Sequence, residues 1–159
     1  DVLSLGGTKN GLLGAEAVVF LNSLGTNEFQ FVRKQSMQLG SKSRFIAAQF
    51  LRYLQDGLWR QIAKRSHEQA IFLRDLLWKE LDLRPVYPVQ SNAVFVSFPR
   101  PWIKDLKKQL FFYVWDAKTW TARLMTTFDT QPEDLKRFVQ TAKKLQQRKG
   151  SNESDLPSH

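Results

Sequence analysis

The chain of 159 residues contains no cysteine, which excludes disulfide bonds and thiolate metal sites. This composition fits a cytoplasmic location, which is our expectation. Only two histidines occur, and neither stands with a second histidine or a carboxylate at metal-ligand spacing, so we expect no bound metal. No apolar run approaches the ~20 residues that a membrane-spanning helix needs, and we expect no membrane partner.

Acidic residues are scarce as well. The chain has 24 lysines and arginines against 15 aspartates and glutamates, a formal net charge of +9. Such an excess can attract nucleic acid, an anionic membrane surface or an anionic ligand. The basic residues are scattered over several predicted helices and form no single stripe. Solvated helix faces are the simpler explanation, and we expect no nucleic-acid partner. The five tryptophans are assigned to core or interface packing rather than to base stacking.

The hydrophobic content of 42% is enough for an ordinary domain with a core. A strand pattern begins almost at Asp1, whereas independent domains usually have some irregular residues before their first strand. We therefore expect a processed chain or a fragment of a longer protein.

The pattern of the first third predicts two strands around a glycine loop. Residues 2–5 predict a short buried strand, residues 6–11 a loop too rich in glycine for regular structure, and residues 15–21 a second strand. Ser41 can cap a helix over residues 42–55. Asp56-Gly57 interrupts the chain, and leucines at helical spacing then predict a long helix.

The remainder predicts a smaller unit that mixes strands and helices. Arg84-Pro85 ends the long helix, and a strand over residues 93–98, a short helix over 102–111 and a strand over 120–128 follow. Thr130-Gln131-Pro132-Glu133 is a capping-box pattern that opens a last helix. Residues 149–159 are polar and are expected to be disordered. The fold class is α/β, with a break after residue 56.

Lys9 is the first candidate for chemistry. A lysine is usually a solvated surface charge, so a chemical role must be argued from its surroundings. Lys9 lies in a glycine loop between two strands that look buried, with Thr8 and Asn10 beside it. A lysine near other cations or in a dry site can attack a carbonyl group and form an imine. The glycines would let a bulky aldehyde approach the backbone.

Several blocks of sequence resemble low-specificity L-threonine aldolases, which belong to the β-eliminating lyase group of the aspartate aminotransferase superfamily. Ser4-Leu5-Gly6-Gly7-Thr8-Lys9-Asn10-Gly11 and Gly14-Ala15-Glu16-Ala17-Val18-Val19-Phe20 are similar to the family's cofactor-lysine region. The later blocks resemble the helix after that lysine, the start of the long helix and the C-terminal strand: Arg33-Lys34-Gln35, Ser41-Lys42, Arg44-Phe45-Ile46-Ala47-Ala48-Gln49, Asp56-Gly57-Leu58-Trp59 and Ala122-Arg123-Leu124-Met125.

The resemblance implies the C-terminal part of a transferase fold that depends on pyridoxal 5'-phosphate. Residues 1–56 would end the large cofactor-binding sheet domain, and residues 57–148 would form the long helix and a small α+β domain. The implied reaction is the retro-aldol cleavage of L-threonine or L-allo-threonine to glycine and acetaldehyde. The implied assembly is a homodimer or homotetramer.

The resemblance also implies roles for single residues. Lys9 would hold the cofactor as a Schiff base and later move protons. Thr8 would lie at the cofactor, and Ser41 and Lys42 would contribute to its phosphate site, where a helix N-terminus and a cation suit an anion. Arg123 would bind the substrate α-carboxylate, which its planar fork matches.

The family pattern departs from this sequence in two places. Met37 stands where relatives usually have glycine. The family's phosphate-cradling glycine loop, its ring-stacking histidine and the aspartate that pairs with the pyridine nitrogen all precede the lysine, and this chain lacks them. By itself the chain is therefore expected to be inactive. Another β-eliminating lyase, an aminotransferase on the same scaffold and a non-catalytic truncated relative remain alternatives.

Overall fold

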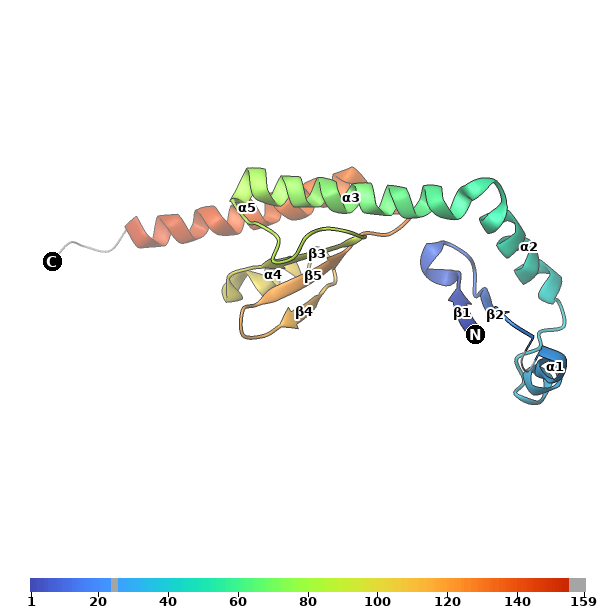
Figure 1. The fold of residues 1–159 in the computed structure, drawn as a ribbon. Coiled ribbons are helices and arrows are strands. Elements are labelled where there is room, and N and C mark those ends of the chain that lie inside the picture. The colour runs from blue at the N-terminus through green and yellow to red at the C-terminus, as the bar shows by residue number, and fades with distance from the viewer. Residues whose placement is uncertain (24–25, 155–159) are drawn as a thin grey trace. The chain divides into compact units, whose positions relative to one another are not determined.

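A computed structural model describes residues 1–23 and 26–154 of the chain (Figure 1). The chain divides into two compact units, Asp1–Ile62 and Ala63–His159. The boundary between the units lies within α3 (Leu58–Leu81). The break expected from the sequence lies a few residues earlier, after residue 56.

The first unit contains a two-stranded hairpin and helices. β1 (Val2–Gly6) pairs antiparallel with β2 (Glu16–Phe20), and Val2 lies opposite Phe20. α1 (Thr26–Gln35), α2 (Ser43–Leu54) and the short 3₁₀ turn η2 (Gln55–Gly57) follow. Both predicted strands are present.

The predicted burial of β1 is wrong for the described chain. Val2 is 56% exposed and Leu3 is 48% exposed. The reason is that the small core of this unit consists of Leu12, Ala15 and Tyr53, with Phe50 and Ile62 packed against them. This core packs the loop after β1 against α2 and the start of α3, and it includes no residue of β1.

The predicted cap of α2 is also wrong. The N-cap position is occupied by Lys42, with φ −119° and ψ 40°, and no side chain caps the helix there. Ser41 lies one residue too early, because an N-cap side chain must reach the amide groups two or three residues ahead.

Met37 ends α1 in a conformation that favours glycine. Its φ is 57°, and the amides of Met37 and Gln38 bond back to the carbonyl oxygens of Lys34 and Arg33. This is the Schellman pattern, in which the left-handed residue is usually glycine because a Cβ atom is strained there. Met37 thus occupies a backbone turn that requires a positive φ.

Met37→Gly is expected to stabilise the protein by up to about 1 kcal/mol, since it relieves left-handed strain. The Met37 side chain is 91% exposed, so little packing is lost. Urea denaturation measures the free energy of unfolding. Met125→Gly is the matched control, because Met125 lies in a strand, where glycine destabilises. Equal destabilisation by both substitutions would contradict the argument.

The second unit is built on an antiparallel sheet of three strands. β3 (Ala93–Ser97), β4 (Tyr113–Asp116) and β5 (Thr121–Met125) are arranged in the order β3-β5-β4. α3 and α5 (Pro132–Ser154) run alongside each other on one side of the sheet (Figure 1). The 3₁₀ turn η3 (Arg100–Trp102) leads into α4 (Ile103–Leu106). The buried core joins these helices to one face of the sheet and includes Leu73, Leu77, Val94, Val96, Leu106, Ala122, Leu124 and Phe138.

Three elements of this unit differ from the sequence-based expectation. β4 was not predicted. The helix expected over residues 102–111 ends at Leu106, and Phe112 then turns into the core. The strand expected over 120–128 begins at Thr121, because Trp120 has a φ of 55° and belongs to the preceding turn.

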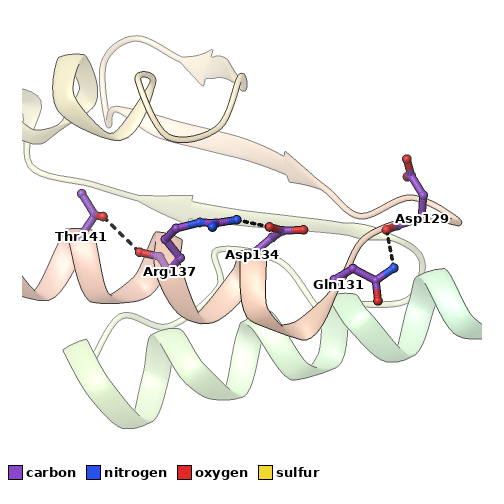
Figure 2. A network of polar contacts seen from close by, with 5 residues as sticks. All are labelled: Asp129, Gln131, Asp134, Arg137 and Thr141. Carbon is purple, nitrogen blue, oxygen red and sulfur yellow. Dashed lines mark hydrogen bonds and ion pairs between the residues drawn. The ribbon is translucent and has the colours of Figure 1, made fainter.

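The start of α5 agrees with the prediction, but its cap does not. The helix begins at Pro132, a residue that suits the first helical position. The hydroxyl of Thr130 accepts a hydrogen bond from the Thr127 amide instead of closing a capping box. Figure 2 shows the polar contacts that follow, from Gln131 to the Asp129 carbonyl, from Arg137 to Asp134 and from Thr141 to the Arg137 carbonyl.

α5 continues to Ser154, so its helical backbone enters the segment 149–159 that was expected to be disordered. Residues 155–159 of that segment lie outside the described residues. Over the described ranges, no helix is long and apolar enough to cross a membrane. In the same ranges, no three histidine, aspartate or glutamate side chains gather as a metal site would require.

Candidate active site

Lys9 is the middle residue of the 3₁₀ turn η1 (Thr8–Asn10), between β1 and β2. Gly11 closes the turn with a φ of 93°, and its amide bonds to the Thr8 carbonyl. At Gly7 an added Cβ would lie 2.6 Å from Leu12 Cδ2 and 3.2 Å from the Ala15 carbonyl oxygen. Glycine is therefore needed at both ends of the turn, for space at Gly7 and for conformation at Gly11.

Backbone hydrogen bonds fold the segment after Lys9 back on the turn. The Gly7 amide donates to the Ala15 carbonyl over 2.8 Å, and the amides of Asn10 and Leu12 donate to the Gly7 carbonyl over 3.0 and 3.2 Å. Leu12 and Ala15 are buried beneath the loop. The backbone that carries Lys9 is thus an ordered turn with its own small core.

The side chain of Lys9 is exposed, as is that of Thr8. Among the described residues neither side chain has a hydrogen bond or an ion pair. The strands beside the turn looked buried from their sequence, but β1 is largely exposed, and the turn that follows it is exposed at Thr8 and Lys9. The primary amine of Lys9 is available to a ligand.

Ser41 and Lys42 lie at the N-terminal end of α2 and are exposed. Within the described part of the chain, neither side chain has a hydrogen bond or an ion pair to the Lys9 turn. The same helix reaches the turn through Gln49 and Tyr53, later along its axis. From Lys42 to Gln49 the axis rises about 10 Å, at 1.5 Å per residue. The first unit thus carries the amine and a helix N-terminus with a cation, on elements that contact each other.

Arg123 lies in the central strand of the second unit, on the sheet face opposite α3 and α5. Its neighbours in sequence, Ala122 and Leu124, are fully buried against the helices, and the alternation of a strand turns Arg123 the other way. Phe95 of β3 and Tyr113 of β4 are its direct cross-strand partners. Arg123 therefore stands between two aromatic side chains.

The Arg123 guanidinium is stacked but not ion-paired. Its Cζ lies 5.7 Å from the ring centre of Tyr113 and 5.5 Å from that of Trp115. Its Nε is buried and has no hydrogen-bond partner, and no described carboxylate pairs with the group. An unpaired donor that is withdrawn from water is costly unless a ligand completes it. A planar anion such as a carboxylate could pair with the terminal nitrogens of this guanidinium.

Trp115 and Tyr113 were not identified as neighbours of Arg123 from sequence, because β4 was not predicted. Trp115 was assigned to core or interface packing, yet it is 56% exposed and contacts Phe95 edge to face. One signal in the sequence could have predicted β4: bulky side chains over residues 113–115 are followed by a turn that Asp116 stabilises. The Lys118 amide donates to the Asp116 carboxylate and lowers its pKa below the usual value, as does the Thr119 hydroxyl.

No family model matches the chain. Two curated proteins do, both named low-specificity L-threonine aldolase. The protein from Pseudomonas aeruginosa is 33% identical over 139 residues, which cover 87% of this chain and 40% of the relative. The protein from Pseudomonas sp. is 33% identical over 131 residues, which cover 82% of this chain and 38% of the relative. The chain thus spans about 40% of the length of the curated relatives it matches.

A solved structure of a threonine aldolase from Leishmania major matches with a TM-score of 0.71 and 26% identity. The match covers 82% of this chain and 39% of that structure. The predicted α/β class is confirmed by this similarity.

Proposed function

The chain belongs to the threonine aldolase family over the residues it shares with these relatives, and we propose that it supplies part of the active site of a carbon–carbon lyase that uses pyridoxal phosphate. The proposed reaction is the retro-aldol cleavage of L-threonine or L-allo-threonine to glycine and acetaldehyde. The single observation that carries the proposal is the ordered glycine turn that presents Lys9.

The residues of this chain fit the cofactor in their chemistry. Lys9 offers a primary amine with no partner among the described residues, which suits an aldehyde. Pyridoxal phosphate, when bound, supplies the electron sink that makes cleavage beside the amino-acid Cα possible. Lys9 would hold the cofactor through Nζ, and the same Nζ, once released, can accept and return a proton. The tight turn at Gly7 and Gly11 fixes the backbone from which Nζ reaches.

Arg123 is proposed to bind the substrate carboxylate. The stacking of Tyr113 and Trp115 restricts the guanidinium plane, so less conformational freedom remains to be lost when a carboxylate binds. The absence of a described carboxylate partner supports this role, because a bidentate carboxylate can accept from two guanidinium nitrogens together. Arg123 therefore orients the amino acid without taking part in bond cleavage.

Ser41, Lys42 and Thr8 are proposed as cofactor contacts. Ser41 and Lys42 stand at a helix N-terminus, where free amide groups and a lysine favour a phosphate. Thr8 precedes Lys9 on the same turn, and its hydroxyl is exposed.

The whole active site is proposed to need more than these residues. The family resemblance implies a ring-stacking histidine and a pyridine-pairing aspartate, and we assign neither role to a residue of this chain. We propose a homodimer or homotetramer in the cytoplasm. The exposed apolar residues of the first unit support an assembly that covers them, and they include Phe31, Val32, Phe45 and Leu51.

Product analysis tests the proposal. The protein, expressed from its complete gene and loaded with pyridoxal phosphate, is expected to release equal amounts of glycine and acetaldehyde from L-threonine or L-allo-threonine. Omission of the cofactor is the control. Release of ammonia and a 2-oxo acid would instead favour another β-eliminating lyase, and amino transfer to an added 2-oxo acid would favour an aminotransferase. A protein that gives no product and binds no cofactor would contradict all three.

A further inference from the structure

The loop that carries Lys9 is held by side chains of α2, a helix that starts more than thirty residues later in the sequence. The Leu13 amide donates to the Gln49 Oε1 over 2.7 Å, and the Gln49 Nε2 lies 3.4 Å from the Leu13 carbonyl oxygen. One side-chain amide therefore pairs with both polar groups of one loop residue, much as a neighbouring strand would.

Tyr53 makes the second contact, one helical turn further along. Its hydroxyl accepts a hydrogen bond from the Asn10 Nδ2, and Asn10 directly follows Lys9. The Tyr53 ring is buried with Leu12 and Ala15 and forms the centre of the small core beneath the loop. Gln49 and Tyr53 are four residues apart, so they project from the same face of α2.

Both contacts lie on the C-terminal side of the lysine. The bond to Asn10 lies immediately after Lys9, and the pair of bonds to Leu13 lies where the loop turns back toward β2. Because the Lys9 side chain is exposed, packing does not fix its position. The orientation of Nζ therefore depends on the backbone of the η1 turn, and that backbone is fixed from outside by α2.

We propose that Gln49 and Tyr53 are positioning residues for Lys9, which hold the η1 turn in the geometry that presents Nζ to the cofactor. This inference rests on the proposed role of Lys9. Neither residue reaches the cofactor in this role, and both act through the loop backbone and Asn10. Their removal should loosen the turn and weaken cofactor binding, while the global fold of the protein remains.

Tyr53→Phe removes one hydroxyl and keeps the buried ring, so it tests the contact without a cavity. Hydrogen exchange of the cofactor-free protein is expected to show the Gly11 and Leu12 amides exchanging about five- to ten-fold faster, because one hydrogen bond no longer opposes local opening. The apparent affinity for pyridoxal phosphate, measured from its visible absorbance, is expected to fall about five-fold. The pH midpoint of that absorbance should also move.

Four further variants make the test specific. Tyr87→Phe is the matched control, since Tyr87 lies in the other unit and contacts Phe95. Asn10→Ala should reproduce the effects of Tyr53→Phe, and the double variant should add nothing, as expected for two ends of one bond. Gln49→Leu, of similar volume, should also speed exchange in the loop.

The outcomes separate this inference from the proposed function. If the unaltered protein shows the Lys9-dependent absorbance but Tyr53→Phe changes neither exchange nor absorbance, the positioning role is overturned and the proposed function stands. If the unaltered protein shows no such absorbance, both are overturned. Faster exchange with weaker cofactor binding, in Tyr53→Phe but not in Tyr87→Phe, supports the positioning role.

Discussion

Lys9→Ala is expected to abolish the visible absorbance of bound pyridoxal phosphate and to lower lyase turnover by about 10³-fold or more. The variant loses both the covalent anchor and the amine that moves a proton. The exposed side chain has no partner among the described residues, so the fold should be retained. Absorbance spectra with added cofactor and steady-state turnover of threonine measure the two effects.

Lys64→Ala is the control for Lys9→Ala. Lys64 is an exposed helix lysine whose ion pair with Glu68 spans 3.7 Å. Such a pair contributes little to stability, and Lys64→Ala should keep the spectrum and the turnover of the unaltered protein. If Lys9→Ala kept a normal spectrum, another residue would have to anchor the cofactor, and the assignment of Lys9 would be wrong.

Arg123→Lys is expected to lower kcat/KM for threonine by about 10- to 100-fold, through a higher KM at nearly unchanged kcat. Lysine keeps the positive charge but loses the planar fork that pairs with a carboxylate, and a hydrogen bond to a charged group contributes about 1.5–3 kcal/mol. The carboxylate is bound in the ground state and in the transition state alike, so its loss affects KM. Steady-state kinetics across threonine concentrations separate the two constants.

Arg84→Lys provides a matched control for Arg123→Lys. The Arg84 guanidinium lies 4.8 Å from the Trp78 ring centre, so it shares the arginine–aromatic stacking of Arg123. It belongs to the irregular segment that follows α3 and not to the sheet. Arg84→Lys should leave KM unchanged. A fall in kcat alone for Arg123→Lys, or an equal loss in both variants, would argue against carboxylate binding by Arg123.

Much of the fold follows from the sequence because local signals and packing agree. Leucines at helical spacing identified α3, and the predicted interruption at Asp56-Gly57 directly precedes its first residue, Leu58. Arg123 was placed in a predicted strand over residues 120–128, and it lies in β5. In these cases the residues that form the hydrophobic pattern in the sequence are also the residues that become buried in the fold.

The rest could not be predicted because it depends on contacts distant in sequence. Nothing near Lys9 indicates that Gln49 and Tyr53 would hold its loop, since pattern analysis does not pair a loop with a later helix. The aromatic surroundings of Arg123 were missed because β4 is short and its register with β5 is irregular. The exposure of β1 was missed because the apolar character of a strand does not show whether the same chain provides its cover.

Chemical trapping of the cofactor tests the central claim most directly. The protein expressed from its complete gene is incubated with pyridoxal phosphate, reduced with borohydride, digested and mapped by mass spectrometry. The account predicts one reduced pyridoxyl phosphate group per chain, on the peptide that contains Lys9. Stoichiometric labelling of another lysine, with Lys9 unmodified, would contradict it.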